Sequence, residues 1–271
     1  MAQKKTSGGV VDYTEKLGRQ TVVGVEEIGN GGFLLLESIY WLFLGPRLKQ
    51  PVRLGAVIVQ MVEIGIQAIP LIAMMAGTIG AMMAMQSIYM LRIFGAESQV
   101  TYGVAFSVVR EFAPLITGIL VAGRSGSALA ARLGTMKISQ EIDALKVMGI
   151  NPVRFLVVPA LLGMLVMVPA LTIFNMMVGL LCAGLYINAD LGISLAAYSE
   201  QIIDILSVGD VIHGVGKSAI FAVLIALIGV INGASVTGGA EGVGKVTTRA
   251  VVQAISAIIV TDMLFAFMAT R

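Results

Sequence analysis

Two long uncharged runs constrain the fold of this chain more than any other feature. Residues 64–91 and residues 155–188 contain no Asp, Glu, Lys or Arg. A transmembrane helix needs about 20 mainly apolar residues, so each run can cross a bilayer. The second run is too short for two helices and a turn, and we expect one long, tilted helix bent at Pro169. With 57% hydrophobic and 13% charged residues overall, the chain is predicted to be an integral membrane protein.

Three further apolar segments complete a predicted all-α fold of five transmembrane helices. They are residues 99–123, 219–239 and 250–269. An amphipathic run-in over residues 54–63 leads into the first span, which Pro70 can kink. The acidic segment 189–216 is predicted to be an external loop that carries an amphipathic helix. No polar stretch is long enough to close a separate soluble core, so any ATPase domain must belong to another chain.

Basic residues predict the orientation in the membrane. Seven Lys and Arg residues precede the first span, five lie within residues 124–154, and Lys245 and Arg249 follow the fourth span. Five spans place all three groups on one side, which the positive-inside rule makes cytoplasmic, with the C-terminus outside. The alternative of six spans would place Lys245 and Arg249 outside. The N-terminus has no apolar core close behind its lysines, so we expect no cleaved signal peptide.

Residues 1–53 are predicted to form a cytoplasmic tail and an interfacial helix, ahead of a transmembrane domain over residues 54–271. Within the first part, residues 33–44 are apolar and aromatic but too short to span a bilayer. Tyr40 and Trp41 suit the headgroup level of an interfacial helix. The alternative is a piece of buried core helix.

An adjacent pair of charges, Arg110 and Glu111, lies near the middle of the second span. A charge at this depth costs at least ~2.5 kcal/mol, so such residues usually face a cavity or a partner. A functional polar site is therefore predicted here, and the alternative is a neutralised structural pair. Asp262, in the last span, is either a further partner for Arg110 or a residue near the outer interface.

A short charged helix is predicted between the second and third spans, over residues 139–148. Ser139 can cap it, with Glu141 and Asp143 in the first turn. The apolar stripe consists of Ile142, Leu145 and Met148. A helix of this length, joined tightly to two spans, suits a lever moved by a cytosolic protein. The alternative is an ordinary interfacial loop helix.

Motifs for covalent chemistry are weak. Residues 239–247 nearly spell a phosphate-binding loop, but Val246 has no hydroxyl and a membrane span precedes the motif, so we expect a glycine-rich turn. His213 is the only histidine, and we expect it near the outer interface; Cys182, the only cysteine, is expected to be a small buried residue. We expect no catalytic residue, no metal, no cofactor and no nucleic-acid partner.

The stretch GRSGSALAARLGTMKISQEIDALKVMGINPVRFLVVP, residues 123–159, resembles the signature of the MlaE permease family. These are membrane subunits of lipid-transporting ABC transporters that work with MCE proteins. REFAP at residues 110–114 and VTTRAVV at residues 246–252 resemble further motifs of the family. Three positions depart from its pattern: Ala113, Arg132 and Ala160. Arg132 stands where an acidic residue is common, which affects the expected ATPase contact.

The resemblance implies a homodimer bound to two ABC ATPase subunits and a periplasmic MCE ring, with a small cytoplasmic accessory protein as a further partner. It implies a bacterial inner-membrane location and a phospholipid cavity lined by Met83, Met90, Leu91, Phe94, Arg110 and Glu111. It also implies an ATPase-coupling helix that contains Ser139, Glu141, Ile142, Asp143, Leu145 and Met148. The expected function is a lipid permease subunit, not an enzyme. A proton-coupled secondary transporter and a non-transporting scaffold are the alternatives.

Overall fold

The computed structural model describes residue 26 and residues 29–45 and 52–269, and these residues form helices without strands. The N-terminal helix is described over residues 29–44. The α-helices that follow are α2 (Leu54–Ile64), α3 (Ile69–Ile93), α4 (Val100–Phe106), α5 (Ala113–Val121), α6 (Ser127–Ile138), α7 (Glu141–Val147), α8 (Val158–Leu191), α9 (Leu195–Ile205), α10 (Val208–Ala234) and α11 (Gly239–Ala269). Short 3-10 segments, η1 (Ile66–Ala68) and η2 (Glu97–Gln99), and π-helical segments, η3 (Ser107–Phe112), η4 (Ala122–Gly126) and η5 (Val153–Val157), join several of them. The predicted all-α fold is confirmed.

Five helical segments within the described residues are long and apolar enough to cross a membrane, which confirms the predicted number of spans. They are Leu54–Ile93, Glu97–Ile138, Val153–Leu191, Val208–Ala234 and Gly239–Met268. The third span is one continuous helix through Pro169, as expected. The second span has 42 residues, or roughly 63 Å at 1.5 Å per residue. This is about twice the thickness of the hydrocarbon core, so helices continue well beyond the apolar runs that identify them.

Two local predictions were wrong. Segment 189–216 is not all loop, because α10 already begins at Val208; the amphipathic helix within it is confirmed as α9. The glycine-rich turn predicted at residues 239–247 is helical instead, since the positive φ angles of Gly238 and Gly239 make the turn earlier. Pro70 lies in the first turn of α3, directly after the 3-10 segment η1 where the first span departs from α-helix, and the kink stays a prediction.

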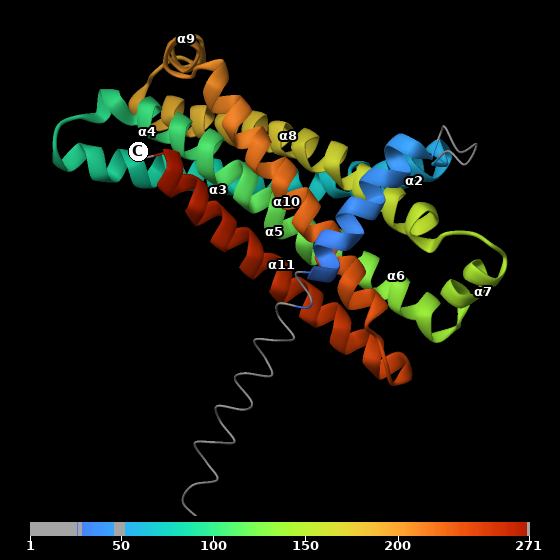
Figure 1. Cartoon of the computed structure of the whole chain (residues 1–271). Helices are drawn as coiled ribbons and strands as arrows, with labels where there is room; N and C mark the ends of the chain where they lie inside the picture. Colours follow the sequence, from blue (N-terminus) through green and yellow to red (C-terminus); the bar gives the residue numbers. More distant parts are fainter. Residues whose placement is uncertain (1–25, 27–28, 46–51, 270–271) are drawn as a thin grey trace, which may run out of the picture.

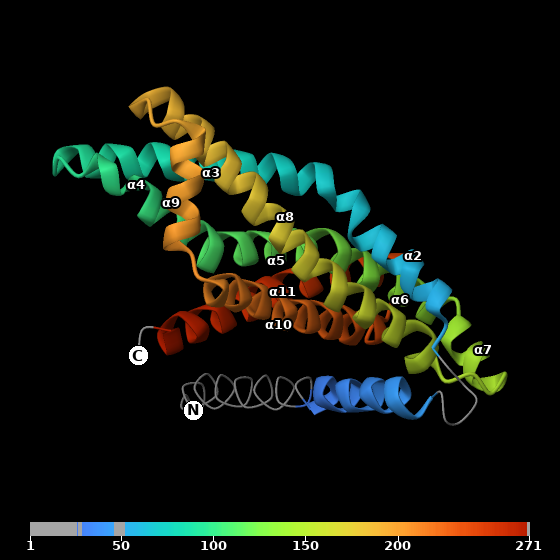
Figure 2. The same ribbon diagram turned by 90° about the horizontal axis from the view of Figure 1, so that it is seen from above.

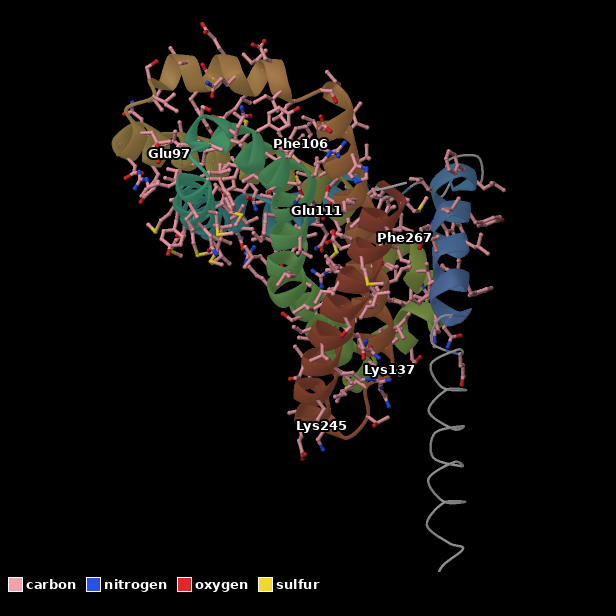
Figure 3. All side chains as sticks on the ribbon, turned by 90° about the vertical axis from the view of Figure 1, so that its left-hand side faces the viewer. Glu97, Phe106, Glu111, Lys137, Lys245 and Phe267 are labelled. Carbon is pink, nitrogen blue, oxygen red and sulfur yellow. The ribbon has the colours of Figure 1, made fainter. Side chains whose placement is uncertain are left out.

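The spans pack side by side, with their connections gathered at two ends (Figures 1 and 2). The turn between α3 and α4, helix α9 and the end of α11 lie at one end, and α7 lies at the other (Figure 1). Lys137 and Lys245 lie together at the α7 end, far from Glu97 (Figure 3). The side of the membrane that each end faces stays a prediction, with the α7 end cytoplasmic.

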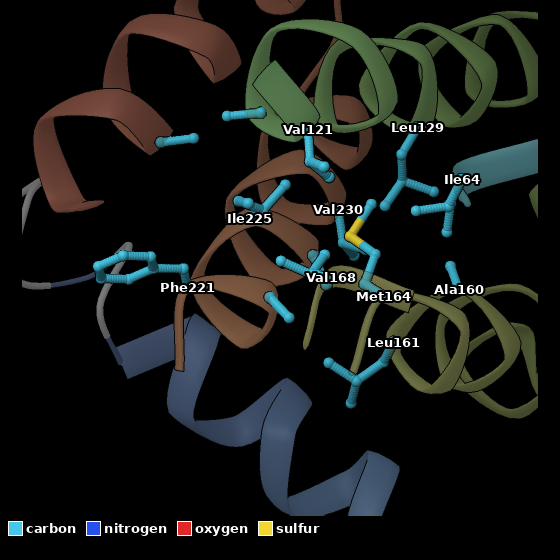
Figure 4. Close-up of a cluster of buried hydrophobic side chains, with 14 of the residues drawn as sticks. Ile64, Val121, Leu129, Ala160, Leu161, Met164, Val168, Phe221, Ile225 and Val230 are labelled. Carbon is cyan, nitrogen blue, oxygen red and sulfur yellow. The ribbon is translucent and has the colours of Figure 1, made fainter. Parts of the chain in front are cut away.

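The largest buried cluster joins α10 to the other spans. Phe221, Ile225 and Val230 of α10 pack there against Val121, at the end of α5, and Met164 of α8 (Figure 4). Each of these side chains is almost completely buried. Because α10 packs against α5, α6, α8 and α11 in this cluster, its polar residues are held at fixed positions within the bundle.

The N-terminal helix contacts residues on either side of the start of the third span. Asn151 Nδ2 donates to Glu37 Oε1 at 2.9 Å, and the Arg154 guanidinium lies 5.4 Å from the Trp41 ring centre. Figure 1 shows this helix, in blue, crossing the direction of α10 and α11. That direction fits an interfacial helix, although its depth in the membrane stays a prediction. The interpretation of residues 1–25 as a tail lies outside the described residues.

Tyr198 fastens α9 to the bundle, and its ionisation is expected to weaken the fold. Its hydroxyl donates to the Leu180 carbonyl at 3.1 Å, and burial raises its pKa to about 12. The phenol ionises near pH 10 once unfolded, so the free energy of unfolding is expected to fall by about 2 kcal/mol between pH 10 and 12. In Tyr198→Phe this part of the pH dependence should disappear, as followed by denaturant unfolding in detergent. An equally steep fall in the variant would contradict this assignment.

Candidate functional site

Arg110 and Glu111 lie in η3, a π-helical turn within the second span. Such a turn accommodates an extra residue in the helix and is frequent at functional sites, because it changes the direction of nearby side chains. Pro114 follows one turn later and has no N–H to donate to the Arg110 carbonyl, four residues before it. The backbone of this turn therefore has an acceptor that a side chain from another helix can use.

Arg110 pairs with Asp210 at the start of α10. Its Nε donates to Asp210 Oδ1 at 2.6 Å. The other oxygen of Asp210 accepts from the backbone N–H and the hydroxyl of Ser207, at 2.8 and 2.7 Å, and completes a capping box. One carboxylate thus fixes the first turn of α10 and anchors the arginine of the second span.

Lys217, two turns further along α10, connects three spans. Its ammonium donates to Glu111 Oε2 at 2.7 Å and to the Arg110 carbonyl at 3.2 Å. It also forms an ion pair with Asp262 Oδ1 of α11 at 2.8 Å. The Lys217 side chain is 0% exposed. A buried ammonium with two carboxylates and a freed carbonyl is a satisfied group, because each partner offsets part of its desolvation cost.

We call Arg110, Glu111, Asp210, Lys217 and Asp262 the charged cluster. Its members carry two positive and three negative formal charges, a net charge of −1. The side chains of Arg110 and Glu111 are 42% and 38% exposed, whereas the other three are largely buried. Figure 3 shows Glu111 partway along the bundle, between the two ends. The cluster can therefore hold three spans together and still present a guanidinium and a carboxylate to a ligand.

The outcome for the predicted polar site is mixed. Arg110 and Glu111 are both in it, but they pair with other helices and not with each other. Asp262 is a partner of Lys217, not of Arg110. Sequence reasoning missed Lys217 and placed Asp210 in a loop, because the fourth span was predicted to start at residue 219. The spacing of seven residues between them was the available signal, since it places both on one helix face.

The other predicted lipid-binding residues lie on or just after α3. Phe94 and Met90 are exposed on the surface of the chain, at 76% and 52%. Met83 is half-buried, and Leu91 packs against a second core cluster that includes Ile88. Among the described residues, no hydrogen bond or ion pair joins these four to the charged cluster. Their role in binding lipid stays a prediction.

The short charged helix predicted between the second and third spans is present as α7, but it is shorter than expected, and its coupling role stays a prediction. Ser139 does not cap it: Gln140, at φ 59°, is the residue before α7. The reason is that α6 runs on to Ile138 and leaves only a tight left-handed turn between the helices. The Ser139 hydroxyl lies within hydrogen-bond distance of Thr135 O and Glu141 Oε1 and can donate to either one. Gly149, at φ 75°, ends the segment as predicted.

The apolar stripe of α7 is divided between the bundle and the surface. Leu145 is buried within the chain, Ile142 is half-buried and Met148 is 64% exposed. Asp143 accepts from Lys146 at 3.1 Å, and this contact lowers the pKa of the Asp143 carboxyl. Val147, which was not among the predicted coupling residues, is 89% exposed. The exposed apolar surface at the end of α7 is therefore formed by residues 147 and 148.

Comparison with known proteins identifies the relatives of this chain. The sequence model of the family described as "Permease MlaE" matches residues 57–268. A probable ABC transporter permease protein of Rickettsia typhi is 30% identical over 94% of this chain and 99% of its own length. The intermembrane phospholipid transport system permease protein MlaE of Haemophilus influenzae is 28% identical over 94% of this chain and 96% of its own. The chloroplastic protein TRIGALACTOSYLDIACYLGLYCEROL 1 of Arabidopsis thaliana is 38% identical over 59% of this chain and 46% of its length.

Proposed function

Because the chain belongs to the MlaE permease family, a family of multi-pass membrane permease subunits, we propose that it transports phospholipid or a related lipid as part of an ABC transporter. In this proposal the lipid passes between the bacterial inner membrane and a periplasmic MCE protein. ATP is hydrolysed by a partner ATPase, and this chain carries out no covalent chemistry. The substrate class is supported by the relative from Haemophilus influenzae, which is named as a phospholipid transport permease.

The half-exposed pair of Arg110 and Glu111 is the observation that carries the proposal. A zwitterionic phospholipid headgroup has a phosphate and an ammonium, and these two side chains offer the opposite charge to each. The exposed methionines and phenylalanine of the α3 end supply flexible apolar surface for acyl chains. Lys217, which is fully buried, has a supporting role because it holds Glu111 in place.

Replacing Arg110 tests the headgroup role. Arg110→Gln is expected to lower lipid transport at least tenfold in a reconstituted complex, since a charge-assisted hydrogen bond contributes about 1.5–3 kcal/mol. The matched control is Arg92→Gln, which removes an exposed arginine at the α9 end that pairs with Glu97 and Asp190. Arg110→Gln leaves the Asp210 carboxylate without its arginine, and the double variant Arg110→Gln/Asp210→Asn removes that carboxylate as well. If that variant regains both stability and transport, Arg110 only holds helices together and the headgroup role is wrong.

The exposed surface of α7 is proposed to be the ATPase-coupling site. Val147→Asp and Met148→Asp are expected to lower transport more than tenfold while the chain still folds, because an unpaired charge buried in an interface costs about 2–5 kcal/mol. ATP hydrolysis and lipid transport are measured on the same reconstituted complex. Leu145→Asp is the less selective variant, since Leu145 is buried in the chain itself. Unchanged transport in both surface variants would remove the coupling role from α7.

A second copy of the chain is the proposed neighbour of α11. Only 11% of the most apolar window of this helix is buried within the chain, and Met263, Leu264 and Phe267 are more than half exposed. Cysteines introduced on this face should cross-link two copies in the membrane.

Co-purification of an ATPase and an MCE protein, with transport that requires ATP, distinguishes the proposal from a proton-coupled carrier and from a scaffold. A proton-coupled carrier would move lipid under a pH gradient without ATP.

A further inference from the structure

A polar cavity lies between the first and second spans, nearer to α7 than the charged cluster is. Arg124 and Arg132 line it from η4 and α6, and Gln60, Glu63 and Gln67 line it from α2 and η1. Its volume is about 80 Å³, whereas one buried water needs about 10–15 Å³. The cavity therefore has room for a group of about five non-hydrogen atoms.

Each of the two arginines that line this cavity has one guanidinium donor without an acceptor among the described residues. Arg124 Nη2 donates to Gln67 Oε1 at 2.9 Å, and Arg132 Nη2 donates to Gln60 Oε1 at 3.0 Å, so a glutamine of the first span orients each arginine. Arg124 Nη1 and Arg132 Nε are buried and have no hydrogen-bond partner among the described residues. Buried donors are nearly always paired, because an unpaired one loses its water without compensation. The arrangement thus favours a ligand that brings acceptor atoms.

The charge of the cavity favours an anion. Among its lining residues, Glu63 is the one carboxylate, and it accepts from Gln60 Nε2 at 3.4 Å while lying 3.6 Å from Arg132 Nη1. Two arginines and one glutamate leave a formal charge of +1. The side chains of Arg132 and Glu63 are 40% and 48% exposed, so a ligand can reach the cavity past them.

The position of the cavity suits a headgroup or a soluble anion at the α7 side of the membrane. Arg124 follows Arg110 by 14 residues, which is roughly 21 Å along a helix, so the cavity and the charged cluster are separate sites. We propose that this cavity binds a phosphate anion, carried either by a lipid headgroup of the leaflet on the α7 side or by free phosphate. Planar guanidinium groups donate in parallel to phosphate oxygens, which distinguishes phosphate from a simple halide. The proposal does not depend on the transport activity proposed above.

The test uses the purified full chain in nanodiscs and has two arms. In the first, inorganic phosphate is titrated against chloride at matched ionic strength, and binding is followed by calorimetry. In the second, native mass spectrometry measures how much phosphatidic acid stays bound after release from the nanodisc. Arg124→Gln and Arg132→Gln are each expected to weaken binding at least tenfold, since each removes a charged donor. Lys245→Gln, an equal change of charge at an exposed lysine of the same end, should leave binding unchanged.

Glu63→Gln keeps the proposal testable if either arginine variant does not fold. It removes the carboxylate that competes for Arg132, so phosphate should bind severalfold more tightly than to the unmodified chain. Retention of phosphatidic acid alone identifies a lipid headgroup site, and binding of inorganic phosphate alone identifies a soluble anion site. The proposal is overturned if the unmodified chain binds neither, or if binding is the same in the arginine variants and in Glu63→Gln.

Discussion

Replacement of Lys217 by methionine is expected to lower the free energy of unfolding by about 3–5 kcal/mol, because it removes the cation from a buried charged network. The ammonium is fully buried and lies 2.7 Å from Glu111 and 2.8 Å from Asp262. Methionine has a similar length and packs well in apolar surroundings, so the loss is mainly electrostatic. Glu111 can be partly solvated at 38% exposure, but Asp262, at 15%, cannot, and its carboxylate accounts for most of the cost.

Neutralising the partners should restore stability. Lys217→Met/Asp262→Asn removes the buried unpaired charge and is expected to recover more than half of the loss, and adding Glu111→Gln should recover most of the remainder. Unfolding by denaturant in detergent micelles gives the three free energies. If Lys217→Met alone is as stable as the unmodified chain, Lys217 does not hold the three spans together. Transport by the triple variant then separates the two roles of the cluster: a stable but inactive protein means that the charges also act on lipid.

The number of spans could be predicted from the sequence, but their ends could not. Uncharged runs such as residues 155–188 are long enough that only a transmembrane helix accounts for them. The ends of the spans are harder to predict, because polar residues do not interrupt the backbone hydrogen bonds of a helix, which can continue beyond the apolar run. Asp210 illustrates the difficulty: it was placed in a loop, whereas it lies in the first turn of α10 and closes the capping box with Ser207, three residues before it.

The charged cluster could be predicted only in part, for a physical reason. Arg110 and Glu111 were found because an intramembrane charge is costly and needs an explanation. Their partners could not be assigned, since three carboxylates and two cations allow several pairings and only the packing of α10 between the other spans selects one. The guanidinium donors of Arg124 and Arg132 that lack a partner among the described residues could not be predicted at all. A sequence shows that an arginine is present but not which of its nitrogens lacks an acceptor.

Gly80→Val is expected to separate α3 from α8 and to destabilise the chain by about 3 kcal/mol or more. Small residues allow transmembrane helices to approach each other closely. Ala76 and Gly80 are buried in α3 where it faces Gly179 of α8. A Cβ on Gly80 would overlap the backbone carbonyl of Gly179. A backbone atom cannot rotate aside as a side chain can, so the helices themselves must move.

The matched control is Gly103→Ala in α4, where an added Cβ would meet nothing within 4 Å. This variant should be at least as stable as the unmodified chain, because alanine has the higher helix propensity by about 1 kcal/mol. Both variants are compared with the unmodified chain by denaturant unfolding in the same detergent. A separation of α3 and α8 would also move the α3 end away from the second span. Gly80→Ala, which adds a smaller side chain than valine, should therefore lower transport while the chain stays folded. If Gly80→Val is as stable as Gly103→Ala, the two helices do not pack through their glycines.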